Sequence, residues 1–200
     1  MQKAKSKSSV IQSAVEIKFW IDRTPTVDEV RPAACVQCEV ASRPFGSRLQ
    51  VIGHGVRQRQ VLGPLQPGQP PSAVTLLVRR FLCLVCGAVM TVLPQGVLGS
   101  RLYCVGAIVM ALALWAIRNL SSAEVRARVS PWNKVADPRQ WAMPARWVRA
   151  VRQARLFLGE LRPSPASWSH RQVAERIVTS LVGGGHPAGA MLKGEFAEAR

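Results

Sequence analysis

The chain has 200 residues, and its composition, 48% hydrophobic and 19% charged, excludes an intrinsically disordered polymer. This length is enough for one ordinary domain or two small ones, and 14 Pro with 15 Gly favour short elements over one large sheet. The net charge of +16 indicates a polyanionic partner, of which nucleic acid is the commonest; solubility charge and a genomic bias towards Arg codons are the alternatives.

Residues 1–34 are predicted to be a weakly structured leader. Their basic start is followed by no continuous apolar core and no small-residue cleavage site, so no secretory signal is expected. Residues 10–21 form a short amphipathic stretch that suits either a helix or an edge strand. The chain's five cysteines include two close pairs, a pattern that favours a reducing compartment over a disulfide framework. We therefore expect a cytoplasmic protein.

Residues 35–100 are predicted to form a small zinc-ribbon-like domain of short antiparallel strands. Residues 49–61 and 73–81 have a strand-like composition, and the Pro/Gly-rich stretch 63–72 between them is expected to be a loop. A CxxC pair lies on either side of these strands. Zinc takes four ligands in a tetrahedron, and a CxxC turn presents two sulfurs on the same side of the backbone. One structural Zn2+ is therefore expected on Cys35, Cys38, Cys83 and Cys86.

Other interpretations of the cysteines stay open. The 44 residues between the pairs exceed the usual spacing of about 15–20, and the 63–72 loop can absorb the extra length as an insertion. An accidental occurrence of two CxxC pairs in a chain with five cysteines is one alternative. A redox pair is less favoured, because neither CxxC begins a helix within a βαβ pattern. His54 is an alternative ligand, but four thiolates already fill the shell, which favours a turn or phosphate-contact role. Cys104 is interpreted as a buried small hydrophobic residue.

Residues 101–160 are predicted to form a mainly helical, helix-turn-helix-like unit. Residues 102–117 are uncharged and rich in Ala and Leu, as expected for a helix. Ser121 and Glu124 have the spacing of a capping box, which begins a short second helix. Pro144 suits the first turn of a third helix that continues to about residue 158. Residues 161–200 are expected to hold a linker, one helix over 169–182 and a loose tail.

The third helix is predicted to carry a basic face. An apolar arc of Trp147, Val151, Ala154 and Leu158 lies opposite four arginines, Arg146, Arg149, Arg152 and Arg155. A helix that packs with one face and presents Arg on the other suits a major-groove recognition helix. A solvated helix has the same pattern, as does a helix that lies on a membrane surface.

The apolar stretch 102–117 also supports an alternative function. A helix that is apolar on all sides is either buried or spans a membrane. Sixteen residues cover about 24 Å, short of a hydrocarbon core of roughly 30 Å, and the terminal Arg101 and Arg118 would have to snorkel. The alternative is a small membrane protein with a spanning helix near 102–117 and a basic cytoplasmic tail.

The cysteine segment resembles a known family. Its strings are Cys35-x-x-Cys38, Gly53-His54-Gly55-x-Arg57-x-Arg59, Val78-Arg79-Arg80-Phe81-x-Cys83-x-x-Cys86-Gly87 and Thr91-x-Leu93-Pro94. They resemble the N-terminal zinc-binding segment of insertion-sequence transposases and, more closely, a bacterial family of unknown function that joins this segment to a helix-turn-helix. The resemblance covers about residues 35–158 and implies zinc ligation by the four cysteines and DNA binding by the helices. The chain departs from the pattern at Glu39, where the first knuckle usually has Gly, and it lacks the transposase catalytic domain.

These observations predict an α+β, zinc-stabilised DNA-binding protein that is transposase-related or accessory to a mobile element. Arg57, Arg59, Arg79 and Arg80 are expected to contact phosphates, with the helix at 146–155 nearest the bases. The chain has no nucleophile–base pair, phosphate loop or two-metal carboxylate spacing, so neither enzymatic activity nor a small-molecule substrate is expected. A separate transposase is a further expected partner, and RNA is the alternative to DNA.

Overall fold

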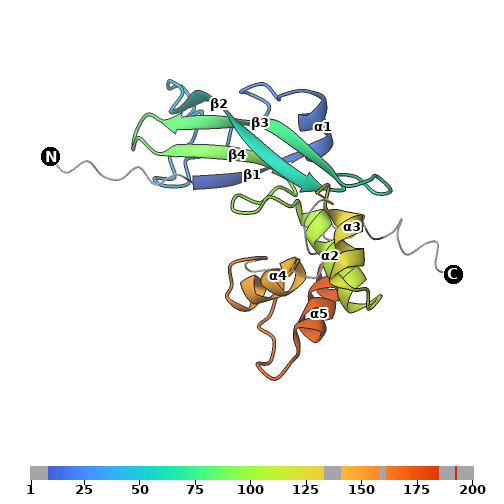
Figure 1. Ribbon diagram of the computed structural model, residues 1–200. Coiled ribbons are helices and arrows are strands. Elements are labelled where there is room, and N and C mark those ends of the chain that lie inside the picture. Colours follow the sequence, from blue (N-terminus) through green and yellow to red (C-terminus); the bar gives the residue numbers. More distant parts are fainter. Residues whose placement is uncertain (1–8, 133–140, 158–160, 185–191, 193–200) are drawn as a thin grey trace. The chain divides into compact units, whose positions relative to one another are not determined.

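The computed structural model describes residues 9–132, 141–157, 161–184 and 192. The chain divides into two compact units (Figure 1). The sheet unit contains residues 1–61 and 74–101, and the helical unit contains residues 62–73 and 102–200. A four-stranded sheet and five helices make up the described elements, so the fold is mixed, as the α+β prediction requires.

The sheet has the strand order β1-β4-β3-β2. Strand β3 (Ser72–Cys83) runs antiparallel to β4 (Val89–Gln95), with Phe81 opposite Met90. Strand β2 (Val51–Gly63) forms one edge and β1 (Ser9–Glu16) forms the other. Buried side chains of the three later strands, including Val51, Val78, Phe81, Met90 and Val92, form the core beside the sheet. The second CxxC pair, Cys83 and Cys86, thus lies at the turn between two central strands.

Strand β1 is parallel to β4, in addition to the antiparallel strands that were expected within residues 35–100 (Figure 1). It lies in the segment predicted to be a leader, and its side chains alternate between half-buried and exposed along its whole length. This alternation with period two is what a strand covered on one face requires. Helix α1 (Ile17–Asp22) follows it directly and buries Trp20. The amphipathic stretch 10–21 is therefore both an edge strand and a helix.

The helical unit is built around α2 (Val105–Ala116), which packs against α3 (Ser122–Val129), α4 (Met143–Arg152) and α5 (His170–Gly183). Nine of the residues of α2 are buried. Because helices cover it on several sides, α2 has apolar residues on all of its faces. The predicted first helix and the capping box of Ser121 with Glu124 are confirmed. In the described part of the chain, no helix combines the length and apolarity needed to cross a membrane.

Helix α4 ends earlier than predicted, at Arg152 rather than near residue 158. The amide of Ala154 donates to the Val151 carbonyl (2.9 Å) and that of Arg155 to the Ala150 carbonyl (2.8 Å), and Ala154 has φ of 50°. These two bonds with a left-handed residue between them form a Schellman motif, which ends helices. The chain turns away at this point, so Arg155 lies outside the helix.

The apolar arc predicted for this helix is also wrong in part. The buried residues of α4 are Pro144, Trp147, Val148 and Ala150, while Ala154 is exposed and Leu158 lies outside the described residues. Trp147 packs edge-to-face on Tyr103, with ring centroids 5.3 Å apart, and on Trp141 at 6.0 Å. This aromatic cluster, together with packing against α2 and α5, holds α4 in the helical unit. The helix-turn-helix interpretation stays a prediction.

Candidate metal centre

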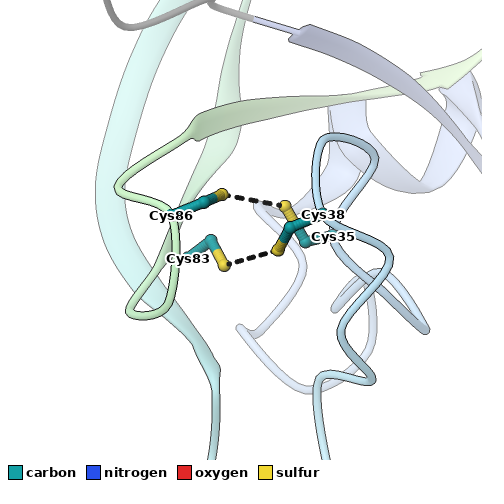
Figure 2. Close-up of side chains that lie close together, drawn as sticks. All are labelled: Cys35, Cys38, Cys83 and Cys86. Atoms are coloured by element: carbon teal, nitrogen blue, oxygen red, sulfur yellow. Dashed lines mark hydrogen bonds between the residues drawn. The ribbon is translucent and has the colours of Figure 1, made fainter. Parts of the chain in front are cut away.

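Two turns of the sheet unit bring four cysteine side chains together (Figure 2). The ligand atoms of Cys35, Cys38, Cys83 and Cys86 all lie within 4.8 Å of one another. The sulfurs of Cys35 and Cys86 are 3.7 Å apart, and so are those of Cys38 and Cys83. Cys35 and Cys83 are buried, whereas Cys38 and Cys86 are exposed. The four predicted metal ligands therefore form one cluster that can hold a metal ion.

The first cysteine turn is closed by backbone hydrogen bonds. The amide of Cys35 donates to the carbonyl of Val40 (2.9 Å), and the amide of Glu39 donates to the carbonyl of Cys35 (2.8 Å). Just outside the turn, Ala34 and Ala41 form an isolated antiparallel bridge. The turn is therefore a short hairpin that holds Cys35 and Cys38 on one side of its backbone.

The second cysteine turn repeats this pattern residue for residue. Cys83 donates its amide hydrogen to the Ala88 carbonyl (2.9 Å), and Gly87 donates to the Cys83 carbonyl (3.0 Å). Here the flanking pair is Leu82 with Val89, which belongs to the β3–β4 ladder. Both turns have a residue with positive φ four places after the first cysteine. In the second turn this residue is Gly87, with φ of 71°.

The first turn requires the same backbone conformation of a glutamate. Glu39 has φ of 59°, a left-handed conformation that costs an L-residue with a Cβ about 1–2 kcal/mol. Glu39 is the position where the transposase segments that the chain resembles usually have Gly, and the turn still requires a left-handed backbone there. The first cysteine turn is strained relative to the second.

Backbone amides and neighbouring thiols set the acidity of the cysteines. Burial raises the pKa of Cys35, but hydrogen bonds from the amides of Gln37 and Cys38 and from nearby thiols lower it to about 7. For Cys86, the amide of Ala88 lowers the pKa, while burial and the other three cysteines raise it to about 12. Four thiolates would repel one another if no cation were bound, and this repulsion keeps Cys86 protonated near neutral pH. A bound cation would offset this repulsion, so metal binding is expected to release protons.

The cluster fits a tetrahedral tetrathiolate site. Four sulfurs each about 2.3 Å from a central zinc ion would be about 3.8 Å apart. The two 3.7 Å separations match this value, and the 4.8 Å limit on the others leaves only a small contraction to make. The donor set is sulfur alone, which suits borderline or soft metals rather than Mg2+ or Ca2+.

Two further sequence candidates lie outside the cluster. His54 lies in an exposed part of β2. Cys104 is buried in the helical unit, where burial raises its pKa to about 11. Its sulfur accepts from the Ala107 amide (3.4 Å) and donates to the Pro64 carbonyl (3.5 Å), so Cys104 caps the first turn of α2. Sequence reasoning found its burial but missed this N-cap role, because Cys is not among the usual N-cap residues.

The four candidate arginines of the strands differ in exposure. Arg57 is exposed on β2, and Arg80 is half-buried on β3. Arg59 donates to the carbonyls of Leu98 (2.7 Å) and Arg101 (2.5 Å); burial, and then the charge of Arg57, lower its pKa. Arg79 donates from Nε to the carbonyl of residue 25 (2.7 Å). Two of the four therefore already stabilise backbone of the sheet unit.

The other four candidates, Arg146, Arg149, Arg152 and Arg155, are all exposed in the helical unit. Arg149 donates from Nε to the Ala145 carbonyl of its own helix (3.4 Å), and Arg152 donates to the carbonyl of Trp168. The first three lie on α4, and Arg155 follows its C-terminal cap. The structure therefore brings the cysteines together and presents a basic α4, with the two sets of arginines in different units.

Comparisons with protein-family models, with curated proteins and with solved structures find no match to this chain. The likeness to the transposase segment stays a prediction from the quoted residues.

Proposed function

We propose that this chain is a zinc-stabilised DNA-binding protein, with the metal in a structural role. The main support is the position of the four cysteines, which come from two turns with the same backbone hydrogen bonds. Their sulfurs all lie within 4.8 Å of one another, and two pairs of sulfurs are 3.7 Å apart. A closed set of four protein ligands is the mark of structural zinc, because catalytic zinc keeps a position open for water or substrate. The protein is therefore proposed to be non-enzymatic, and its many thiols suit a cytoplasmic setting.

The charge distribution supports a nucleic acid as the partner. Residues 43–162 carry 17 cations and three anions, and almost all of the cations are Arg. Guanidinium groups match phosphate with two parallel hydrogen bonds, which an ammonium cannot do. Exposed Arg146, Arg149 and Arg152 give α4 a basic surface, while its buried face packs in the unit. In this proposal α4 lies nearest the bases, and Arg57 contacts phosphate from the sheet unit.

The proposed biological setting is a mobile element. It rests on the resemblance of the cysteine strings to the zinc-binding segment of insertion-sequence transposases. A separate catalytic transposase is the partner this setting implies. Co-purification of such an enzyme with the tagged protein from its native cell supports the setting; a set of partners without nucleic-acid enzymes counts against it.

Neutralising arginines of α4 tests DNA binding. In the double variant Arg146→Gln/Arg149→Gln, binding of a labelled DNA duplex is followed by fluorescence anisotropy at several salt concentrations. Each lost phosphate contact should lower the slope of log affinity against log salt by about 0.9. The matched control, Lys18→Gln/Arg23→Gln, removes the same charge from residues 1–42, where cations and anions nearly balance. If both double variants bind with the same affinity and slope as the unmodified protein, the assignment of α4 is wrong.

A further inference from the structure

A turn beside the metal centre presents a bare aromatic ring. Phe45 has a relative exposure of 106%, so none of the residues that the structure describes covers its side chain. Large aromatic side chains bury 150–250 Å² when they are covered, and soluble proteins usually use them in cores and interfaces. A phenylalanine left wholly in solvent is therefore best explained by a partner that covers it.

The turn holds this ring in a defined place. The amide of Ser47 donates to the carbonyl of Pro44 (3.2 Å), which closes a β-turn with Phe45 and Gly46 at its centre. Gly46 has φ of 68°, the positive value that the third position of a type II turn needs. Pro44 also limits the backbone before the ring. The turn needs little reordering to meet a ligand, which favours affinity.

The base of the loop is tied to the second cysteine turn. The amide of Gln50 donates to the carbonyl of Ser42 (3.0 Å), and this closes the loop that carries Phe45. The carbonyl of Gln50 in turn accepts from the amide of Leu84 (2.8 Å), which lies inside the second CxxC. The position of the ring therefore depends on the cysteine cluster.

Arginines flank the ring in the sequence Arg43-Pro44-Phe45-Gly46-Ser47-Arg48. Arg43 is held by Asp28, which also accepts from Arg31 (2.8 Å). Arg48 is exposed. An aromatic face between cations is the arrangement by which proteins hold unpaired bases: the ring stacks on the base and the cations bind the adjoining phosphates.

We propose that Phe45 stacks on an unpaired nucleobase, so that the sheet unit binds single-stranded or locally opened nucleic acid. This inference rests on the proposed function and specifies the form of nucleic acid. In a fully paired duplex both faces of each base are covered by its neighbours, so the ring has no face to stack on. Arg48 binds a phosphate next to the stacked base.

A protein partner is the competing occupant. Val36, Leu84 and Val85, the apolar residues inside the two CxxC pairs, are also about half exposed. The flanking arginines and the net charge of +16 favour a polyanion over an apolar protein surface. Aromatic residues and Arg are also enriched in protein interfaces, so the net charge of the chain, rather than the ring itself, favours a nucleic acid as the occupant.

Substitutions of Phe45 in the full, zinc-loaded chain test the proposal by fluorescence anisotropy. The probes are a labelled oligo-dT strand, a paired duplex, and the same duplex with a central unpaired bubble. Phe45→Ala should weaken binding of the strand and the bubble by about 5- to 150-fold, the range for one stacked base, and leave duplex binding unchanged. Phe45→Trp should retain binding, whereas Phe45→Leu, apolar but not aromatic, should lose it. Phe19→Ala, at an exposed phenylalanine on α1, is the matched control and should change nothing.

Each outcome decides the point. Equal loss on all three probes, no loss on any, or full retention by Phe45→Leu overturns stacking while the proposed function stands. Absence of binding by the unmodified protein to every probe contradicts the proposed function itself and removes the basis of this inference. If Phe45→Ala changes only self-association in sedimentation velocity, the ring belongs to a protein interface and the proposal is wrong. Circular dichroism and zinc content should be unchanged in the Phe45 variants, because that side chain is fully exposed.

Discussion

The two units of the molecule are stabilised in different ways. In the helical unit, α2 is covered by three helices, and a cluster of Tyr103, Trp141 and Trp147 packs beside them. In the sheet unit, the segment 34–50 contributes little regular structure and is held by a cysteine turn facing a second one. Both units have an apolar core, but only the sheet unit has a segment that regular structure and core packing leave to be fixed by the two cysteine turns.

The largest expected effect separates the units. Cys83→Ser should abolish metal binding and release the segment 34–50, because metal binding and folding are coupled in such sites. Hydrogen exchange should show lost protection at the amides of the two cysteine turns, while those of α2 and α5 stay protected. Cys104→Ser is the control, since this buried cysteine lies outside the cluster, and it should keep its metal. If the two cysteine turns exchange equally slowly in Cys83→Ser and in the unmodified chain, a metal ion does not fix the segment 34–50.

The converse change should affect only the helical unit. Trp147→Ala deletes a side chain that is 2% exposed, and the cavity should cost about 3–5 kcal/mol of unfolding free energy. Denaturant titration followed by tryptophan fluorescence and circular dichroism measures this loss. Metal content should stay at the unmodified value. A variant that also loses its metal would show that the two units do not have separate sources of stability.

The two cysteine turns offer a finer comparison. Glu39→Gly should stabilise the sheet unit by about 1 kcal/mol, because Gly adopts positive φ without the Cβ clash. Gly87→Ala should cost about the same amount, and entirely through the backbone, since an added Cβ there meets no atom within 4 Å. The readout is the chelator concentration that removes half of the metal. Opposite shifts are expected, and equal or absent shifts would mean that the turns are not strained as their φ values indicate.

The smallest effect concerns the end of α4. Ala154→Gly should raise the unfolding free energy of the helical unit by about 0.5–1 kcal/mol, because Ala154 occupies the left-handed position of a Schellman motif. The control is Ala150→Gly in the same helix, which should destabilise by a similar amount. If Ala154→Gly and Ala150→Gly change the unfolding free energy in the same direction, α4 does not end where the structure places its C-terminus.

Local signals in the sequence predicted what depends on near neighbours. The CxxC spacing predicted the cysteine cluster, and the capping box at Ser121 marked the start of α3. The end of α4 was missed, because an alanine in a left-handed conformation leaves no trace in the sequence. Had residue 154 been Gly, the usual helix-stop signal would have been present.

Long-range features were the least predictable. The pairing of β1 with β4 joins strands more than seventy residues apart, and an alternating segment does not specify its partner. The roles of Arg59 and Arg79 depend on carbonyls of Leu98, Arg101 and Pro25, which only the fold brings near. Sequence reasoning therefore assigned the same phosphate-binding role to arginines that the structure uses differently.

The central claim is that one metal ion joins the two cysteine turns. Native mass spectrometry of the purified full chain, with elemental analysis of the same sample, measures it most directly. We predict one zinc per chain, its loss in both Cys35→Ser and Cys83→Ser, and its retention in Cys104→Ser. A metal-free protein whose sheet unit keeps full hydrogen-exchange protection would contradict it.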